Sequence, residues 1–260
     1  MIETSRSGAI ATLTIRRAEK KNAVNEAMWR SLLAHCQRIK AEVAADPRSA
    51  PRVLLLQGQS GAFCAGADIE EMQTLMRDAA VLAANNVVVA QAQLALEHLP
   101  IPTIAVIDGA CFGGGFGIAA ACDFRIGSTR SLFAITPAKL GLLYSVEDTR
   151  RVVALLGPTR AKRLLLRSER LDAATALQWG VLDALVEPDA LAAAAHEWAA
   201  QLAAQSSTSL AGIKATVSLI EGNASLNEAQ VRAAFDAAFA GADFAEGTAA
   251  FLARRTPDFG

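Results

Sequence analysis

Three consecutive glycines constrain this chain more than any other feature of its sequence. They end the run Gly-Ala-Cys-Phe-Gly-Gly-Gly at 109–115, which follows an apolar stretch at 103–107 and opens an alanine-rich segment. Because glycines cost backbone entropy, such a run is expected where the main chain turns tightly or where a ligand approaches it closely. We therefore predict a strand-to-helix turn whose N–H groups, at the start of the helix, can face negative charge.

A second turn of small residues follows the apolar stretch 53–57 and reads Gly-Ala-Phe-Cys-Ala-Gly-Ala-Asp at 61–68. Two parallel strands, each followed by a tight loop and a helix, can bring two main-chain N–H groups to one oxygen atom. Such an arrangement is an oxyanion hole, in which one donor lowers a reaction barrier by about 3 kcal/mol. The alternative is that both loops only pack helices against a sheet. The presence of two such loops favours the oxyanion hole.

The rest of the chain predicts an α/β fold, because strands and helices alternate through its first half. We expect strands at 9–15, 53–57, 103–107, 124–126 and 132–134, and helices at 25–46 (capped by Asn25) and 79–98. From 146 onward we expect helices only. One ends at 156, the next starts at Pro158, and the others lie at 188–204, 210–220 and 226–239. These expectations divide the chain into a core at 1–200 and a C-terminal helical region at 201–260.

Composition argues against several classes of protein. The formal net charge is -1, from 25 Lys+Arg and 26 Asp+Glu, so we expect no nucleic-acid partner. The four cysteines and three histidines are scattered, so we expect buried, reduced thiols and neither a disulfide framework nor a metal site. No apolar run reaches the roughly 18 residues of a membrane span, and the N-terminal residues do not read as a secretory signal. We therefore expect a cytoplasmic protein with no membrane partner.

The glycine run does not match the common nucleotide-binding or nucleophile motifs. A dinucleotide pattern G-x-G-x-x-G that begins at Gly113 needs glycine where the chain has Ile118. A phosphate loop needs Gly-Lys-Ser/Thr and a nucleophile elbow needs G-x-S-x-G, and the sequence contains neither.

Both loops resemble the signature loops of the enoyl-CoA hydratase/isomerase, or crotonase, family. The similarity lies in 62–68 and 109–115, while 17–25 resembles the family's early CoA-binding loop and 251–259 its C-terminal helix and tail. The resemblance implies a spiral of ββα units with a C-terminal helical trimerisation region, assembled as a homotrimer or a dimer of trimers. It also implies an acyl-CoA thioester as substrate, with coenzyme A entering as part of that substrate and no separate cofactor.

By the same resemblance, the N–H groups of Ala67 and Gly114 hold the thioester oxygen as it becomes an enolate. Contacts to the CoA or acyl part are implied at Lys21, Ala23, Ala65, Asp68, Ile69, Gly113, Gly117, Pro137 and Leu142. Asp68 also suits the cap of a helix. Candidate contacts for the CoA phosphates are Lys20, Lys21, Lys214 and Arg254.

The pattern departs from a hydratase of this family at both catalytic glutamates. One lies two residues after the last glycine of the run, where this chain has Gly117. The other lies four residues after the phenylalanine of the next strand, where this chain has Pro137. Neither side chain can transfer a proton, and general acid–base catalysis contributes about 10²–10⁴-fold. We therefore predict negligible hydration of crotonyl-CoA.

The segment 136–144 resembles methylmalonyl-CoA decarboxylase, with Tyr144, the chain's one tyrosine, at the position of a tyrosine in that enzyme. Decarboxylation reaches the enolate without proton abstraction, which suits the missing glutamates, and the phenol would orient the carboxylate or relay a proton. That enzyme differs at Ala67, where it has histidine, and at Gly117, where it has glutamate. The alternative for Tyr144 is a ring that lines a pocket, with its hydroxyl bonded to the backbone.

The nearest carboxylates to this segment are those of Glu147 and Asp148. Some isomerases of the family place their single base close by, at the position of Ser145. The run from Ser145 also reads as a helix start, with the serine as cap and the two acids in the first turn, and this reading is favoured.

We predict an acyl-CoA enzyme that stabilises an enolate and runs a decarboxylase, lyase or isomerase reaction. The alternative is a catalytically silent acyl-CoA binder or a scaffold. RNA binding, which a few relatives achieve with a lysine-rich first helix, is not favoured. The helix at 25–46 balances Arg30, Arg38 and Lys40 against Glu26 and Glu42.

Overall fold

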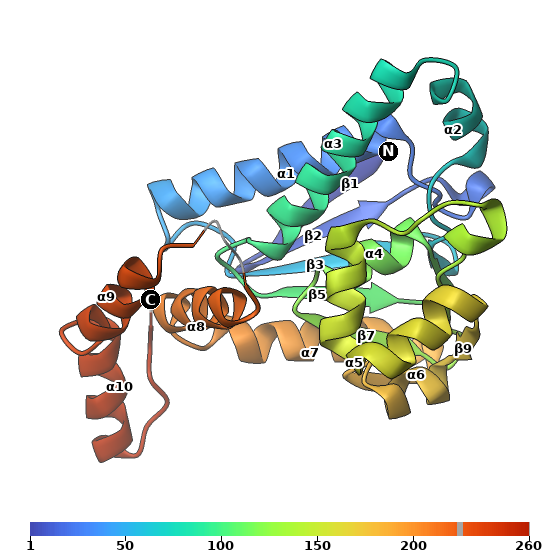
Figure 1. Cartoon of the computed structure of the whole chain (residues 1–260). Coiled ribbons are helices and arrows are strands. Elements are labelled where there is room, and N and C mark those ends of the chain that lie inside the picture. Colours follow the sequence, from blue (N-terminus) through green and yellow to red (C-terminus); the bar gives the residue numbers. More distant parts are fainter. Residues whose placement is uncertain (223–225, 260) are drawn as a thin grey trace.

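The computed structural model describes residues 1–222 and 226–259. Within these residues two β-sheets form the centre of the fold (Figure 1). The larger sheet has the strand order β1 (Ile2–Ser7), β2 (Ile10–Ile15), β3 (Val53–Gly58), β5 (Thr103–Ile107), β7 (Phe124–Ser128), β10 (Ala184–Val186). The smaller sheet has the order β4 (Ala62–Cys64), β6 (Ala110–Phe112), β8 (Leu132–Ala134), β9 (Arg170–Asp172). Only β1 with β2 and β8 with β9 pair in antiparallel fashion in these sheets.

The chain repeats one succession of elements: a long strand, a short strand and then a helix. Strands β3 and β5 lie in the larger sheet, and each is followed by a short strand of the smaller sheet, β4 or β6. The helices α2 (Ile69–Leu75) and α3 (Ala79–Glu97) follow β4, and α4 (Gly114–Ala120) follows β6. Because β4 and β6 are parallel neighbours, the two loops of small residues leave the same edge of the sheet. The predicted α/β spiral of ββα units is confirmed.

Both faces of the larger sheet are covered, which explains the continuous apolar runs of β3 and β5. Leu54 and Leu56 belong to the core that includes α1 (Glu26–Ala45) and α3, whereas Val53 and Leu55 belong to a second core that includes α7 (Leu191–Ala203). Figure 1 shows α1 and α3 above the sheet and α7 below it. The prediction of strands buried on both faces is confirmed.

Five strands were not predicted: β4 and β6, which lie in the two loops of small residues, and β1, β9 and β10. Beyond 146 we expected helices only, but β9 and β10 lie there, and each is three residues long. A strand this short shows no alternation that a sequence pattern can reveal. In β1 only Ile2 is buried, because the strand lies at the sheet edge. The predicted break before Pro158 is confirmed, since α5 (Val146–Arg167) is interrupted at Gly157, with φ 72° and ψ 163°.

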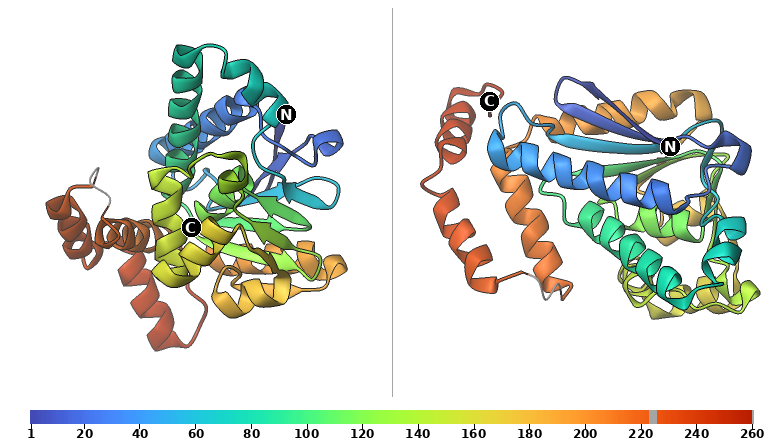
Figure 2. Two further views of the ribbon diagram at one scale, coloured as in Figure 1. Left: turned by 45° about the vertical axis from the view of Figure 1, so that its right-hand side comes forward. Right: turned by 90° about the horizontal axis from the view of Figure 1, so that it is seen from above.

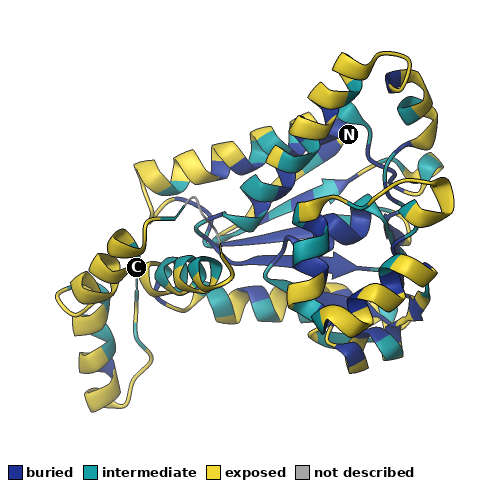
Figure 3. Cartoon of the chain, viewed as in Figure 1, coloured by how far each residue is buried: buried dark blue, intermediate teal, exposed yellow. Residues whose placement is uncertain are grey.

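The last three helices lie to one side of the sheets (Figure 2). The first of them is a mixture of half-buried and exposed residues, and the other two are largely exposed (Figure 3). These helices are α8 (Ser207–Ile220), α9 (Glu228–Ala238) and α10 (Ala242–Ala253). The helix predicted at 226–239 corresponds to α9, and the residues 223–225 before it lie outside the described part. The predicted boundary after 200 falls within α7. The remaining helical elements are α6 (Ala173–Trp179) and the 3-10 turns η1 (Ala18–Lys20), η2 (Pro137–Leu140) and η3 (Pro188–Ala190).

Helix α3 is the longest apolar helix that bears on the expectation of no membrane span. By length and composition alone it is apolar enough to cross a membrane, although we expected no such segment. Its sequence is not an uninterrupted apolar run, because Asn85 and Gln93 lie within it. In the structure, Val88, Ala92 and Leu96 pack into the main core, and α3 lies against α1. One side of the helix therefore packs on the core of this fold.

Candidate active site

The loop after β4 is held from outside by Val24, which forms a single parallel bridge with Ala67. The Val24 N–H donates to Gly66 O at 2.8 Å, and the Asp68 N–H donates to Val24 O at 3.1 Å. This bridge uses the groups on either side of Ala67, so the Ala67 N–H points away from Val24. Among the described residues, that N–H has no hydrogen-bond acceptor.

Each glycine of the run at 113–115 meets a different requirement. Gly113 caps α4 with φ 48° and ψ -112°, a conformation that disfavours other residues. A Cβ atom on Gly115 would lie 2.4 Å from Cys64 O, so only glycine lets α4 approach the first loop this closely. A Cβ atom on Gly114 would make an ordinary contact with the Trp29 ring at 3.5 Å. The distinctive group of Gly114 is therefore its N–H, which lies in the first turn of α4 and has no acceptor in the described part of the chain.

The two amides lie next to each other. A Cβ atom built on Gly114 would lie 3.6 Å from Ala67 N, and one built on Gly66 would lie 3.6 Å from Gly114 N. Gly66 itself has φ 111°, which again favours glycine. The structure thus brings together the two predicted amide donors from loops that are separated by more than forty residues of sequence.

A third segment, which contains η1, supports the first loop through a residue that sequence reasoning missed. Asn22 is fully buried, and its Nδ2 donates to Ala62 O and to Gln59 O, both at 2.7 Å. Its Oδ1 accepts from Arg17 N at 2.8 Å, and its φ is 59°. The Ala65 N–H donates to the carbonyl of exposed Lys21 at 3.0 Å. Asn22 gives no signal in the sequence beyond its place in the segment that resembles a CoA-binding loop.

Asp68 is a helix cap, as the alternative interpretation stated. Its carboxylate accepts from the N–H groups of Glu70 at 3.0 Å and Glu71 at 3.3 Å, and it pairs with Arg17 at 2.6 Å. Burial acts to raise the pKa of Asp68, but these hydrogen bonds and the Arg17 charge outweigh it and hold the pKa below its usual value. The carboxylate is therefore ionised and already bonded.

The space beside Gly117 is occupied by two polar side chains from other helices. A Cβ atom on Gly117 would lie 2.5 Å from Gln93 Nε2, from α3, and 2.6 Å from Asp148 Oδ1, from α5. Both side chains are buried. Gln93 Nε2 has no hydrogen-bond partner among the described residues. A glutamate side chain at this position would collide with both groups.

Asp148 belongs to an ionic cluster that joins α5 to α3. Its Oδ1 pairs with Arg151 at 3.0 Å, and Arg151 in turn contacts Glu97 at 2.6 Å. Burial raises the pKa of Asp148 above its ordinary value, although the Arg151 charge opposes the shift. The predicted cap is also present, since Ser145 Oγ accepts from Asp148 N at 3.0 Å.

Tyr144 donates its hydroxyl to Gly113 O at 2.9 Å, as the alternative for this residue stated. Burial and then the Asp148 charge raise the pKa of Tyr144 well above its usual value. The phenol therefore stays protonated. Its O–H is engaged in the hydrogen bond to Gly113 O, the carbonyl directly before Gly114. The other predicted contacts on this side, Pro137 and Leu142, close a turn in which Leu142 N donates to Pro137 O at 3.0 Å.

Of the other residues predicted to contact the CoA or acyl part, some lie beside the two loops and others lie elsewhere on the surface. Ala23 is buried beside Val24, and Ile69 is exposed at the first turn of α2. Lys20 pairs with Glu70 at 2.6 Å. Arg254 is exposed just after α10.

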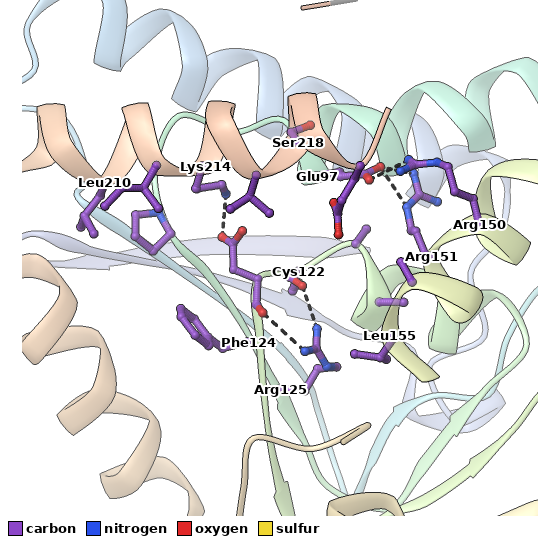
Figure 4. Close-up of a pocket in the computed structure, with 18 of the residues that line it drawn as sticks. Glu97, Cys122, Phe124, Arg125, Arg150, Arg151, Leu155, Leu210, Lys214 and Ser218 are labelled. Atoms are coloured by element: carbon purple, nitrogen blue, oxygen red, sulfur yellow. Dashed lines mark hydrogen bonds and ion pairs between the residues drawn. The ribbon is translucent and has the colours of Figure 1, made fainter. Parts of the chain in front are cut away.

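A cavity of about 530 Å³ lies apart from these loops, between α5, α8 and the start of β7 (Figure 4). Figure 4 shows Arg150 and Arg151 directed at Glu97. Lys214, a candidate for the CoA phosphates, donates to Asp123 at 2.6 Å and to Ile101 O at 2.9 Å. The Lys214 charge is thus paired inside the fold and is not directed at the two amides.

Cys64 and Cys122 are buried, free cysteines. Burial raises the pKa of Cys64 and Cys122 to about 12, so both thiols are protonated at neutral pH. No group of three side chains suited to hold a metal ion occurs within 1–222 and 226–259.

Comparisons with known proteins agree on one family. The sequence profile of the enoyl-CoA hydratase/isomerase family matches residues 5–260. The 1,2-epoxyphenylacetyl-CoA isomerase of Escherichia coli is 31% identical over 253 residues, which are 96% of this chain and 94% of that protein. The crystal structure of an enoyl-CoA hydratase/isomerase family protein from Hyphomonas neptunium superposes with a TM-score of 0.91 at 34% identity, covering 100% of this chain and 97% of that one. A structure described as an enoyl-CoA hydratase/carnithine racemase from Magnetospirillum magneticum has the same TM-score at 32% identity, with coverage of 100% and 95%.

Proposed function

Since the chain belongs to the enoyl-CoA hydratase/isomerase family, we propose that it binds an acyl-CoA thioester and stabilises its enolate between the Ala67 and Gly114 amides. The observation that carries this proposal is the pair of adjacent, unbonded N–H groups from two separate loops. Donors fixed in this way need no reorganisation as charge develops on the carbonyl oxygen, which is why they lower the barrier. We extend the proposal to the CoA part, for which the exposed Lys21 and the neighbouring Ala65 offer the nearest contacts beside the first loop.

Within this class we propose a reaction other than hydration, either decarboxylation or the shift of a double bond. Addition of water requires one group to activate the water and another to protonate the substrate. Gly117 and Pro137 offer no such groups, and the space beside Gly117 is already filled. The 1,2-epoxyphenylacetyl-CoA isomerase, which this chain matches over 94% of that protein's length, supports a reaction other than hydration.

A panel of thioesters tests the proposal. The protein is incubated with crotonyl-CoA, 3-hexenoyl-CoA, malonyl-CoA and methylmalonyl-CoA, and the products are identified by mass spectrometry. We expect loss of carbon dioxide or movement of the double bond, with negligible hydration of crotonyl-CoA. Hydration at the rate of an ordinary hydratase contradicts the choice of reaction. Binding without conversion of any thioester favours the alternative of a silent binder.

The same panel with Tyr144→Phe tests the role of the phenol. Because the hydroxyl is bonded to Gly113 O and its proton is held tightly, we expect a positioning effect only. The loss of one neutral hydrogen bond, about 1 kcal/mol, corresponds to roughly a fivefold loss of turnover. A loss of about 10²-fold or more shows instead that the phenol transfers a proton.

A further inference from the structure

Gly117 lies in α4 three residues after Gly114, whose N–H belongs to the first turn of the helix. Residues three apart on a helix are neighbours, about 5–6 Å from each other. At Gly117 the missing side chain leaves room for a carboxylate from α5, whose Oδ1 lies 2.6 Å from the position of a Cβ atom. The Asp148 carboxylate therefore sits about one helical turn from an amide that we assign to the thioester oxygen.

We propose, on the basis of the function above, that Asp148 is the residue that transfers protons at the carbon next to the thioester carbonyl. When the carboxylate takes the proton, the C–H bond breaks, an O–H bond forms on Asp148, and the electron pair moves to the carbonyl oxygen between the two amides. In the reverse direction the protonated Asp148 delivers a proton to the enolate carbon. Both double-bond migration and the completion of a decarboxylation need this transfer.

The ionic surroundings of Asp148 suit a group that changes its charge. Arg151 bonds to Asp148 at 3.0 Å, and it also bonds twice to Glu97, at 2.9 and 2.6 Å. Burial acts to raise the pKa of Glu97, but Arg151 and Arg150 outweigh it and keep that carboxylate ionised. When Asp148 becomes protonated, Arg151 remains paired with Glu97, so no buried charge is left without a partner.

The competing explanation is that Asp148 is only a structural acid in the first turn of α5. The two explanations differ in how removal of the Asp148 charge changes the free energy of unfolding. A structural acid stabilises the fold through its charge, whereas a carboxylate with a raised pKa does not. The charged and polar groups that face Asp148 are Arg151 from α5, Gln93 from α3, and Ser145 and Tyr144 from the segment before α5. The pKa of Asp148 remains raised because burial outweighs them. A carboxyl with a raised pKa in the folded state binds its proton more tightly there than in the unfolded chain. Its ionisation therefore lowers stability as the pH rises through that pKa.

The test measures exchange of the α-hydrogens of propionyl-CoA and hexanoyl-CoA with D2O, by mass spectrometry, in wild type and in Asp148→Asn. We expect the exchange rate to fall by about 10²–10⁴-fold, with unchanged acyl-CoA affinity in calorimetry and a melting temperature at neutral pH that is not below that of wild type. The matched control is Glu147→Gln, in the same helical turn, which should exchange at the wild-type rate. Exchange by Asp148→Asn at the wild-type rate overturns the assignment.

If Asp148→Asn melts at a lower temperature than wild type, its loss of exchange could come from damage to the fold. A second variant then tests the role of Asp148. Gly117→Ala leaves the carboxylate in the chain but places a methyl group 2.6 Å from Asp148 Oδ1, so the carboxylate must shift. We expect at least about a tenfold loss of exchange. Its control is Gly212→Ala in α8, where a Cβ atom meets nothing within 4 Å. Wild-type exchange in Gly117→Ala overturns the assignment.

The same measurements separate this inference from the function on which it depends. If wild-type protein neither binds the thioesters nor exchanges their hydrogens, the proposed function fails and the inference fails with it. If wild type exchanges and both variants also exchange at its rate, only the role of Asp148 fails.

Discussion

At the scale of single residues, the site combines groups that a sequence reveals with groups that it hides. The two tight loops could be predicted because runs of small residues mark tight turns, and the family resemblance then singled out Ala67 and Gly114 within them. Asp148 was read as a first-turn acid, because nothing near it in the sequence shows that Gly117 leaves space for its carboxylate. Asn22 was missed for a similar reason: its partners Gln59 and Ala62 lie far along the chain.

The hydrogen bonds of Asn22 lead to a prediction about turnover. In Asn22→Ala the buried carbonyls of Gln59 and Ala62 lose their donor, which should cost about 1–3 kcal/mol of the free energy of unfolding. The loop that carries Ala67 is then less well held, and a shift of about 1 Å is enough for roughly a 10²-fold loss of kcat. Steady-state kinetics with the best thioester of the panel, combined with a urea titration, measures both effects.

The matched control for this variant is Asn25→Ala. Asn25 lies three residues further on, and its side chain accepts only from Met28 N, at the start of α1. Loss of this cap should cost about 1 kcal/mol of stability and leave kcat unchanged. A wild-type kcat in Asn22→Ala, at reduced stability, would show that Asn22 supports the fold and not the amide.

At the scale of elements, long and buried helices and strands could be predicted from the sequence, whereas very short strands could not. The long apolar strands β3 and β5 and the helices α1 and α3 have enough residues to show their pattern. The three-residue strands β9 and β10 exist only because β8 and β7 offer a partner edge, and a sequence does not display a partner. Pro158 marked the break in α5 because proline is favoured in the first turn of a helix.

The C-terminal helices carry an apolar surface that leads to a prediction about assembly. Exposed apolar side chains on α8, α9 and α10 are Ile213, Val217, Ile220, Phe235, Phe239, Phe244, Phe251 and Leu252. Exposed apolar residues gathered in this number are typical of protein–protein contact surfaces. The family resemblance implies a trimer or a dimer of trimers, so we expect light scattering to give the mass of a trimer or a hexamer. The mass of a single chain at micromolar concentration would contradict this expectation.

A pair of variants links that mass to these helices. Phe251→Glu places a charge on α10, where the side chain is 82% exposed in the single chain, and should shift the mass toward that of one chain. Leu177→Glu on α6 places the same charge at another exposed apolar position and should leave the mass unchanged. Equal masses for wild type and Phe251→Glu would argue against α10 as part of the contact.

At the scale of the whole molecule, the site forms where two parallel strands, β4 and β6, end at the same edge of the smaller sheet. That arrangement places the first turn of α4 against the loop after β4, and the glycines at 113–115 allow the close approach. The family resemblance predicted this arrangement from the sequence. The ionic cluster of α3 and α5 emerges only once the helices are packed.

The central claim is that the Ala67 and Gly114 N–H groups bind one thioester oxygen, and isotope-edited infrared difference spectroscopy tests it most directly. The carbonyl carbon of a bound acyl-CoA is labelled with ¹³C, and its stretching frequency is compared with that of the free thioester in water. We predict a lower frequency on binding to wild type, and a largely lost shift in Gly114→Pro, which removes one N–H at a helical position that tolerates proline. An unshifted carbonyl in wild type, or an equal shift in Gly114→Pro, would contradict the claim.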